Sequence, residues 1–423
     1  MTRGPITTTS RRLAGSGARV LLRAGRWCAR VLASIAEPPD TREPAPAGTF
    51  PVVAYLAGGP SLRYQVDQWI PVLETLDHEH KVLVVVRTPE LAGALRTGTR
   101  LPVACATTLE DLLAVYAAVD TKVILYPNNG SLNFQSLIYR EALHVHVNHG
   151  ESDKSSMASN QAKAYDAVIV AGAVAEDRYC NALLDFSGAS LIRCGRPQLD
   201  VPRSPSLDPH PSRRTVLYAP TWSGEEDSNN CTSVDVYGPQ IIRQLLHDSR
   251  WRVVYKPHPR VVDGDRPAVH TAHREILDQL DAAQRTDPDA QHRFVPRADV
   301  LSLFGVTDLL ITDVSSVGLD FLYLRPEVPI LLTDRRSNRA ALVTSSPLAT
   351  GTGVLDAATV SDTAELVAHH LAHDPFAPER STLRDRYFGI EPGESTTRFL
   401  EVIGAQVRRR DELVRARENR QRM

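Results

Sequence analysis

Apolar and polar residues alternate along the chain in two successive series. In the first series, short apolar runs rich in β-branched residues alternate with segments in which apolar residues recur at helical spacing. The apolar runs predict strands at residues 52–56, 82–86, 102–104, 122–126, 144–148, 167–170 and 190–193. The helical spacing predicts helices at residues 64–76, 109–118 and 173–184. This alternation is typical of a parallel sheet covered by helices on both faces.

The second series begins after residues 201–212, which contain four prolines and have the composition of a linker. Its predicted strands are 215–218, 252–255, 309–312 and 330–332, and its predicted helices are 239–247, 298–304 and 316–324. The sequence therefore predicts an α/β protein with two Rossmann-like domains facing a cleft. Open sheets of this kind bind ligands at the carboxyl ends of their strands.

The two series and their flanking segments divide the chain into four parts. Residues 46–205 are predicted to form the first Rossmann-like domain and residues 206–400 the second. Residues 1–45 contain a predicted helix and a proline-rich linker. Residues 401–423 form an arginine-rich tail, whose end is predicted to be a solvated helix.

The first 36 residues contain no acidic side chain and predict a basic amphipathic helix. One face of this helix carries a stripe of four arginines: Arg19, Arg23, Arg26 and Arg30. The other face is apolar and includes Trp27, which suits docking on an anionic membrane surface. Two alternatives stay open, namely packing on the protein's own body and a cleaved organellar transit peptide. Because the arginines interrupt the apolar region, a twin-arginine export signal is not predicted.

The composition narrows the classes of function. The chain has 423 residues, of which 42% are hydrophobic and 23% charged, as in ordinary globular proteins. The formal net charge is −2, so the chain lacks the overall basic field that nucleic-acid binding favours. Five cysteines without a C-x-x-C pair argue against a disulfide framework and a zinc site, and indicate a reducing cytosol.

Candidate chemistry lies where predicted strands end. The chain has no P-loop and no G-x-G-x-x-G after its first strand. His149 and Gly150 follow the predicted strand 144–148 and precede the segment Glu151-Ser152-Asp153-Lys154. A histidine at the carboxyl end of a strand suits removal of a proton from a hydroxyl. The alternative is a histidine that only caps the turn.

The second series offers three further polar motifs at strand ends. Tyr218-Ala219-Pro220-Thr221-Trp222 can hold a phosphate oxygen or stack a base, or it is a packed loop. Lys256-Pro257-His258-Pro259-Arg260 holds three cationic side chain types on a proline-fixed backbone, which suits a diphosphate. Thr312-Asp313-Val314-Ser315-Ser316 leads into a helix, whose free N–H groups can bind an anion. Ordinary helix capping by Asp313 or Ser315 is the alternative.

These four motifs, in this order, resemble the CDP-glycerol glycerophosphotransferase family of wall teichoic acid polymerases and primases. The resemblance covers about residues 140–400 and includes Asp320-Phe321 after the serine motif. Gly195-Arg196-Pro197 with Asp200 is similar to the family's turn between domains, and residues 393–398 are similar to its C-terminal region. Where the family commonly has Thr-Pro-Leu-Lys, this chain has Glu151-Ser152-Asp153-Lys154.

The resemblance implies a GT-B-like fold with an acceptor-side first domain, a nucleotide-donor second domain, and no metal or other cofactor. It implies transfer of an alditol phosphate, with glycerol phosphate expected, from a CDP-linked donor to a hydroxyl, releasing CMP. The acceptor would be a cell-envelope glycopolymer or a prenyl-linked molecule. By position, His149 is expected as the general base, and His258 with Lys256 as the group that holds the diphosphate. Substrate contacts are expected from Gly150, Lys154, Thr221, Arg260, Thr312, Asp313, Ser315 and Ser316.

A membrane-bound acceptor would also account for the basic N-terminal helix. The expected location is therefore cytoplasmic, at the inner face of the plasma membrane. Two other classes of function stay open. One is a GT-B glycosyltransferase that uses a nucleotide sugar for surface polysaccharide synthesis, and the other is a non-catalytic nucleotide-binding protein.

Overall fold

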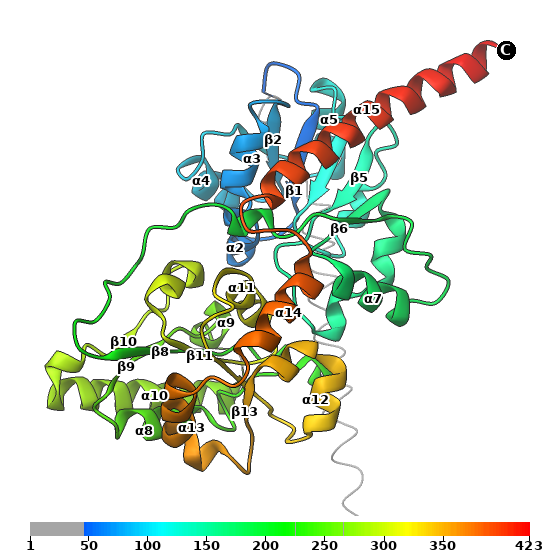
Figure 1. The fold of residues 1–423 in the computed structure, drawn as a ribbon. Coiled ribbons are helices and arrows are strands. Elements are labelled where there is room, and N and C mark those ends of the chain that lie inside the picture. The colour runs from blue at the N-terminus through cyan, green and yellow to red at the C-terminus, as the bar shows by residue number, and fades with distance from the viewer. Residues whose placement is uncertain (1–45, 225, 265) are drawn as a thin grey trace, which may run out of the picture.

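Two parallel sheets form the body of the protein, one above the other in Figure 1. The computed structural model describes residues 46–224, 226–264 and 266–423. The first sheet has seven strands in the order β3-β2-β1-β4-β5-β6-β7. These are β1 Val52–Leu56, β2 Val82–Val86, β3 Val103–Cys105, β4 Val123–Tyr126, β5 Leu143–His146, β6 Ala167–Val170 and β7 Leu191–Arg193. Every pairing within this sheet is parallel, as the alternating sequence pattern predicts.

Helices cover both faces of the first sheet. They are α2 Tyr64–Asp67, α3 Ile70–Leu76, α4 Pro89–Arg96, α5 Leu109–Ala118, α6 Asn133–Ser136 and α7 Ala173–Ala182. Alternate residues of β1 point to opposite faces, so Val52 and Ala54 pack with α3 and α4, while Val53 and Tyr55 pack with α5. Because both faces are buried, the strands read as continuous apolar runs.

The second sheet has six parallel strands in the order β10-β9-β8-β11-β12-β13. They are β8 Arg214–Ala219, β9 Trp251–Tyr255, β10 Arg293–Phe294, β11 Leu309–Thr312, β12 Ile330–Thr333 and β13 Gly353–Leu355. The helices of this part are α8 Gly238–Leu246, α9 Pro259–Val262, α10 Pro267–Thr286, α11 Ser316–Leu324, α12 Arg339–Ser345, α13 Thr363–Ala372 and α14 Ala377–Phe388. Helices α8, α10 and α13 pack on one face, and α11 and α14 on the other.

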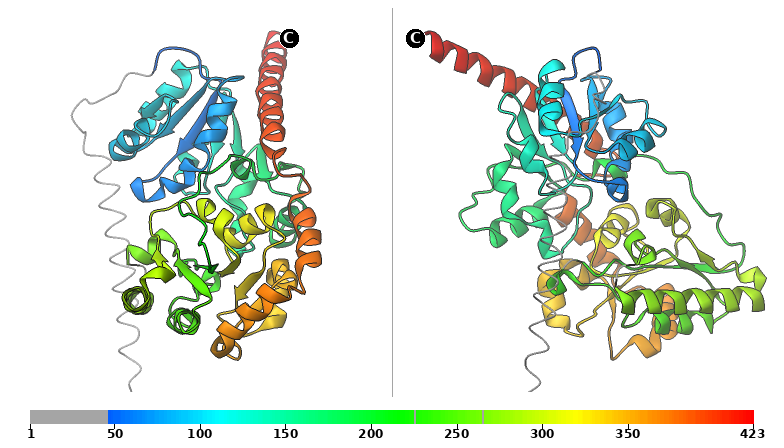
Figure 2. Two further views of the ribbon diagram at one scale, coloured as in Figure 1. Left: turned by 60° about the vertical axis from the view of Figure 1, so that its left-hand side comes forward. Right: turned by 180° about the vertical axis from the view of Figure 1, so that it is seen from behind.

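The chain crosses between the two sheets twice. After β7 it runs through the predicted linker to β8, and after α14 it returns to the first sheet as α15, Ser395–Arg422. Phe399, Val402 and Ile403 of α15 pack in the core of the first sheet. The predicted boundary at residue 400 therefore falls inside a helix, and this helix packs with the first sheet. Figure 2 shows the end of α15 extending beyond the rest of the described chain.

Most predicted elements are present, with differences at particular places. Strands 52–56, 82–86, 167–170 and 309–312 have their predicted bounds. The single helix predicted at 64–76 is broken into α2 and α3, and the helix predicted at 298–304 is a 3-10 helix at Val300–Val306. The amphipathic helix predicted within residues 1–36 lies outside the described residues. Among the described helices, none is long and apolar enough to cross a membrane.

Candidate active site

Polar loops from both sheets meet in a cavity of about 180 Å³. The carboxyl ends of parallel strands share one edge of a sheet, and here the two carboxyl edges face each other. The lining includes His149 from the loop after β5, and Thr221, Lys256 and His258 from the loops after β8 and β9. Ser315 and Ser316, at the start of α11, also line it. The structure thus brings six of the predicted site residues to one place.

His149 sits on a strained turn that the first sheet holds in position. Asn148 has φ of 55°, and its side-chain oxygen accepts a 2.8 Å hydrogen bond from the backbone N–H of His149. The indole N–H of Trp69 donates to the backbone carbonyl of Asn148 at 2.5 Å. Burial, followed by the nearby charge of Arg196, lowers the pKa of His149 to about 4. The ring is therefore neutral at pH 7 and can accept a proton.

His258 is held by the backbone of its own loop. It caps α9, and its Nδ1 accepts a hydrogen bond from the backbone N–H of Arg260 at 3.2 Å. The proton of the neutral ring is therefore on Nε2. Burial, followed by the charges of Lys154, Lys256 and Arg260, lowers the pKa of His258 to about 3. The neutral Nε2–H is a hydrogen-bond donor for a phosphate oxygen.

Lys256 supplies positive charge beside His258. Its side chain is buried, and burial lowers its pKa to about 8. The ammonium donates to the backbone carbonyl of Pro257 at 3.2 Å, which leaves further N–H donors for a ligand. Lys256 also lines an adjoining cavity of about 640 Å³, together with Arg203 and Arg297. A diphosphate bound at Lys256 would therefore have room on that side for a larger group.

The first sheet reaches the second through Lys154 and Gly150. The ammonium of Lys154 donates to the hydroxyl of Thr221 at 3.1 Å, and burial lowers the pKa of this lysine. A Cβ on Gly150 would lie 3.2 Å from the Cβ of Ser316, so the loop after β5 lies directly against the start of α11. Only glycine allows this approach without displacement. Lys154 also lines a larger cavity of about 710 Å³ between the two sheets.

Two buried polar atoms at the cavity have no partner in the described part of the chain. They are Nδ1 of His149 and Oγ of Ser315. Ser315 is the N-cap residue of α11, and its side chain makes no capping hydrogen bond. Buried polar atoms are normally satisfied, so these two indicate a site that a polar ligand completes. The start of α11 adds backbone N–H groups and the positive end of the helix dipole.

Three residues predicted to contact the substrate do not line this cavity. Thr312 is fully buried and donates to the carbonyl of Ala219 at 2.8 Å. Asp313 is also fully buried, and its carboxylate accepts a hydrogen bond from the backbone N–H of Thr221 at 2.7 Å, which fixes the loop after β8. The guanidinium of Arg260 lies 4.0 Å from the ring centroid of Trp222 and does not line the cavity. The sequence places these residues at strand ends correctly, but it does not show where their side chains point.

Sequence reasoning missed an aromatic residue of the site. Tyr64 of α2 lines the cavity, and its ring contacts the rings of His149 and His258 at centroid distances of 5.7 and 5.8 Å. Tyr64 begins a short helix after β1, and no motif around it would have marked it as a site residue.

Sequence reasoning also missed the ion pairs that tie the two sheets together. Arg196 and Asp320 form a buried pair at 2.9 Å. Arg178 pairs with Asp153, whose carboxylate also accepts from Ser346 and Tyr387 of the second part of the chain. The predicted turn at Gly195 meets Ser395, because a Cβ on Gly195 would lie 2.1 Å from the serine Oγ.

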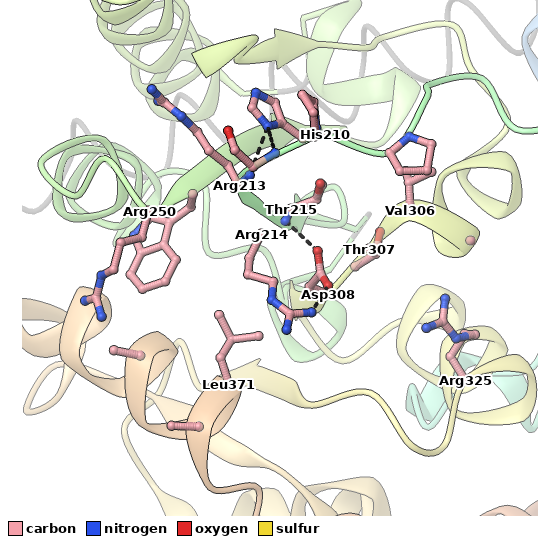
Figure 3. Close-up of a pocket in the computed structure, with 17 residues that line it drawn as sticks. His210, Arg213, Arg214, Thr215, Arg250, Val306, Thr307, Asp308, Arg325 and Leu371 are labelled. Carbon is pink, nitrogen blue, oxygen red and sulfur yellow. Dashed lines mark hydrogen bonds and ion pairs between the residues drawn. The ribbon is translucent and has the colours of Figure 1, made fainter. Parts of the chain in front are cut away.

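A further cavity, of about 670 Å³, lies at the opposite, amino edge of the second sheet (Figure 3). Its charged side chains are paired, as Arg214 with Asp308 at 2.8 Å and Arg213 with Asp287 at 2.8 Å. None of the predicted site residues lines it. Within residues 46–224, 226–264 and 266–423, no group of three or more His, Cys, Asp or Glu side chains is arranged to hold a metal ion.

The fold is shared with several solved enzymes. A putative UDP-N-acetylglucosamine 2-epimerase from Listeria monocytogenes is 14% identical over 85% of this chain and 97% of its own, with a TM-score of 0.55. A variant of the wall teichoic acid polymerase TagF is 13% identical over 96% of this chain and 100% of its own, with a TM-score of 0.54. MurG from Acinetobacter baumannii is 9% identical over 84% of this chain and 99% of its own, with a TM-score of 0.50. These similarities define the class as a GT-B-like α/β protein.

A match to a family model shows which family the chain belongs to. Residues 151–404 match the family model of CDP-glycerol:poly(glycerophosphate) glycerophosphotransferase, and the chain belongs to this family of transferases. The match begins directly after His149 and Gly150 and includes Lys256, His258 and the start of α11. No curated protein matches the chain.

Proposed function

We propose that the protein transfers glycerol phosphate from CDP-glycerol to a hydroxyl of a poly(glycerophosphate) or prenyl-linked acceptor, releasing CMP. The observation that carries this proposal is the meeting of two neutral histidines from different sheets in one cavity, beside Lys256 and the start of α11. Phosphoryl transfer needs an aligned hydroxyl and stabilisation of charge more than it needs covalent chemistry. This cavity offers a proton acceptor on one side and hydrogen-bond donors with positive charge on the other.

His149 acts as the general base. It takes the proton of the acceptor hydroxyl while the acceptor oxygen forms a bond to the phosphorus of the glycerol phosphate. Its pKa of about 4 means that it is neutral at pH 7 and can accept a proton. A bound diphosphate would raise this pKa because a nearby negative charge favours the imidazolium. After transfer the proton passes to solvent.

Lys256, His258 and the start of α11 stabilise the leaving CMP. The bond that breaks joins the transferred phosphorus to the bridging oxygen of the diphosphate, and that oxygen leaves with CMP. His258 and Lys256 both line the cavity, and in this proposal Nε2–H of His258 and the ammonium of Lys256 donate to its phosphate. Ser315 and Ser316 offer a hydroxyl and backbone N–H groups to the other phosphate.

The acceptor is proposed to enter the cavity from the side of the first sheet. We also propose that it is linked to a membrane. His149, Gly150 and Lys154 all come from the loop after β5 of that sheet. Action on a membrane-linked acceptor places the protein in the cytoplasm at the inner face of the plasma membrane. Docking by residues 1–36 stays a prediction from their sequence pattern.

A nucleotide-release assay tests the proposed reaction. Purified full-length protein is incubated with CDP-glycerol, CDP-ribitol and a panel of nucleotide sugars, each with an oligo(glycerophosphate) acceptor, and released nucleotide is separated by chromatography. We expect CMP from CDP-glycerol, with the rate reduced at least about 100-fold in His149→Ala, as for loss of a general base. Nucleotide release from a sugar donor alone would instead support the glycosyltransferase alternative.

A further inference from the structure

Tyr64 connects the two candidate catalytic histidines without belonging to either strand-end loop. Its ring stands edge-to-face against His149 and His258, with interplanar angles of 85° and 88°. The residue comes from α2 of the first sheet, whereas His258 belongs to the second, so the ring spans the cleft. It lines both the 180 Å³ cavity and the adjoining 640 Å³ cavity. An aromatic ring therefore occupies space beside the group that takes the proton and the group that holds phosphate.

The first sheet holds this ring in place through a series of buried amides. The hydroxyl of Tyr64 accepts a hydrogen bond from Nε2 of Gln65 at 3.2 Å, and Oε1 of Gln65 accepts from Nδ2 of Asn128 at 2.8 Å. Asn133 in turn donates to the backbone carbonyl of Asn128 at 2.7 Å. Gln65, Asn128 and Asn133 are all buried. These amides lie in helices and a loop around the first sheet. The position of the ring therefore does not depend on a donor bound at the second sheet.

Two nucleophiles compete for the phosphorus of the donor in the cavity that this ring lines. Attack by the acceptor hydroxyl gives the extended acceptor and CMP, whereas attack by water on the same phosphorus gives free glycerol phosphate and CMP. A general base activates water as well as it activates an alcohol, so the base alone does not discriminate. An apolar ring beside the base leaves less room for water.

We propose that Tyr64 is a specificity-determining residue that excludes water from the space between His149 and His258, so that transfer prevails over hydrolysis. This inference rests on the proposed transfer reaction. The ring acts by its volume, and the hydrogen bond that its hydroxyl accepts from Gln65 is an additional contact that this role does not require. Phenylalanine at this position keeps the volume, and alanine removes it.

The test measures how CDP-glycerol is partitioned between two products. Full-length wild type, Tyr64→Ala and Tyr64→Phe are given CDP-glycerol and an oligo(glycerophosphate) acceptor, and free and transferred glycerol phosphate are counted separately. We expect the ratio of hydrolysis to transfer to rise at least about fivefold in Tyr64→Ala and to stay near the wild-type ratio in Tyr64→Phe. Phe134→Ala, which removes a 48% exposed aromatic of the same sheet outside the cavity, is the matched control.

A second measurement needs no turnover. Diethylpyrocarbonate modifies neutral, accessible imidazoles, and peptide mass spectrometry reports the modification rates of His149 and His258. We expect these rates to rise at least about fivefold in Tyr64→Ala and to stay unchanged in Tyr64→Phe and Phe134→Ala. Unchanged partition or unchanged modification rates in Tyr64→Ala would overturn the inference. Absence of CMP release from wild type, with protected histidines, would instead count against the proposed function alone.

Discussion

Replacing Asp320 with asparagine should remove a loss of stability that the wild type undergoes between pH 4 and pH 7. Asp320 is 3% exposed, and burial raises its pKa to about 6, although Arg196 at 2.9 Å acts in the opposite direction. In the unfolded chain the same carboxyl titrates near 3.9. Because the pKa of Asp320 is higher in the folded state than in the unfolded chain, its protonated form favours folding. This contribution to the unfolding free energy is complete below about pH 4 and is lost as the pH rises through about 6. The difference of about two units corresponds to about 3 kcal/mol at pH 7.

Urea unfolding of wild type and Asp320→Asn at pH 4 to pH 7.5 measures this effect. Because the two proteins differ at one titrating group, the contributions of all others cancel in the difference. We expect the stability of Asp320→Asn relative to wild type to rise by about 3 kcal/mol between pH 4 and pH 7. Arg196→Met should instead lower the stability at pH 7 by more than about 1 kcal/mol, because Asp320 then stays protonated. Parallel pH curves, with Asp320→Asn less stable throughout, would refute the reasoning.

Two further predictions concern the pH profile and the turn at Gly195. In the free enzyme kcat/KM for CDP-glycerol should rise through about pH 4 as His149 loses its proton and fall through about pH 8 as Lys256 loses its charge. Lys256→Arg should abolish the fall in kcat/KM near pH 8, because arginine keeps its charge there. An unchanged fall would exclude Lys256 as its source. Gly195→Ala should lower the unfolding free energy by at least about 2 kcal/mol, because φ is 64° and its Cβ would lie 2.1 Å from Oγ of Ser395. Adding Ser395→Gly to Gly195→Ala should recover the part of the lost unfolding free energy that is due to this clash. Equal losses in the single and the double variant would contradict the clash.

The site was predictable as far as it depends on strand ends. Parallel strands present their carboxyl ends at one edge, so the motifs around His149, Thr221, Lys256 and the two serines of α11 could be placed together from the sequence alone. The apolar runs of β1 and β2 are buried on both faces and therefore had unambiguous bounds. These are properties of the local sequence that a sheet preserves.

The remaining parts depend on contacts between distant segments. Phe399, Val402 and Ile403 have visible helical spacing, but the spacing does not say that α15 returns to the first sheet. The direction of Asp313 into the core is set by its hydrogen bond from Thr221, 92 positions away. Tyr64 enters the site because α2 folds across the cleft, and nothing in its neighbouring residues indicates that path.

Titration calorimetry of CDP-glycerol tests the central claim that His258 holds the diphosphate of the donor whereas His149 acts on the acceptor. The measurement compares full-length wild type, His149→Ala and His258→Ala. We predict that His149→Ala binds CDP-glycerol within about threefold of wild type, because a base for the acceptor makes no required contact with the donor. His258→Ala should bind at least about tenfold more weakly, since it loses a buried donor to phosphate. Loss of binding in His149→Ala with normal binding in His258→Ala would contradict the assigned roles, and no binding by wild type would contradict the donor.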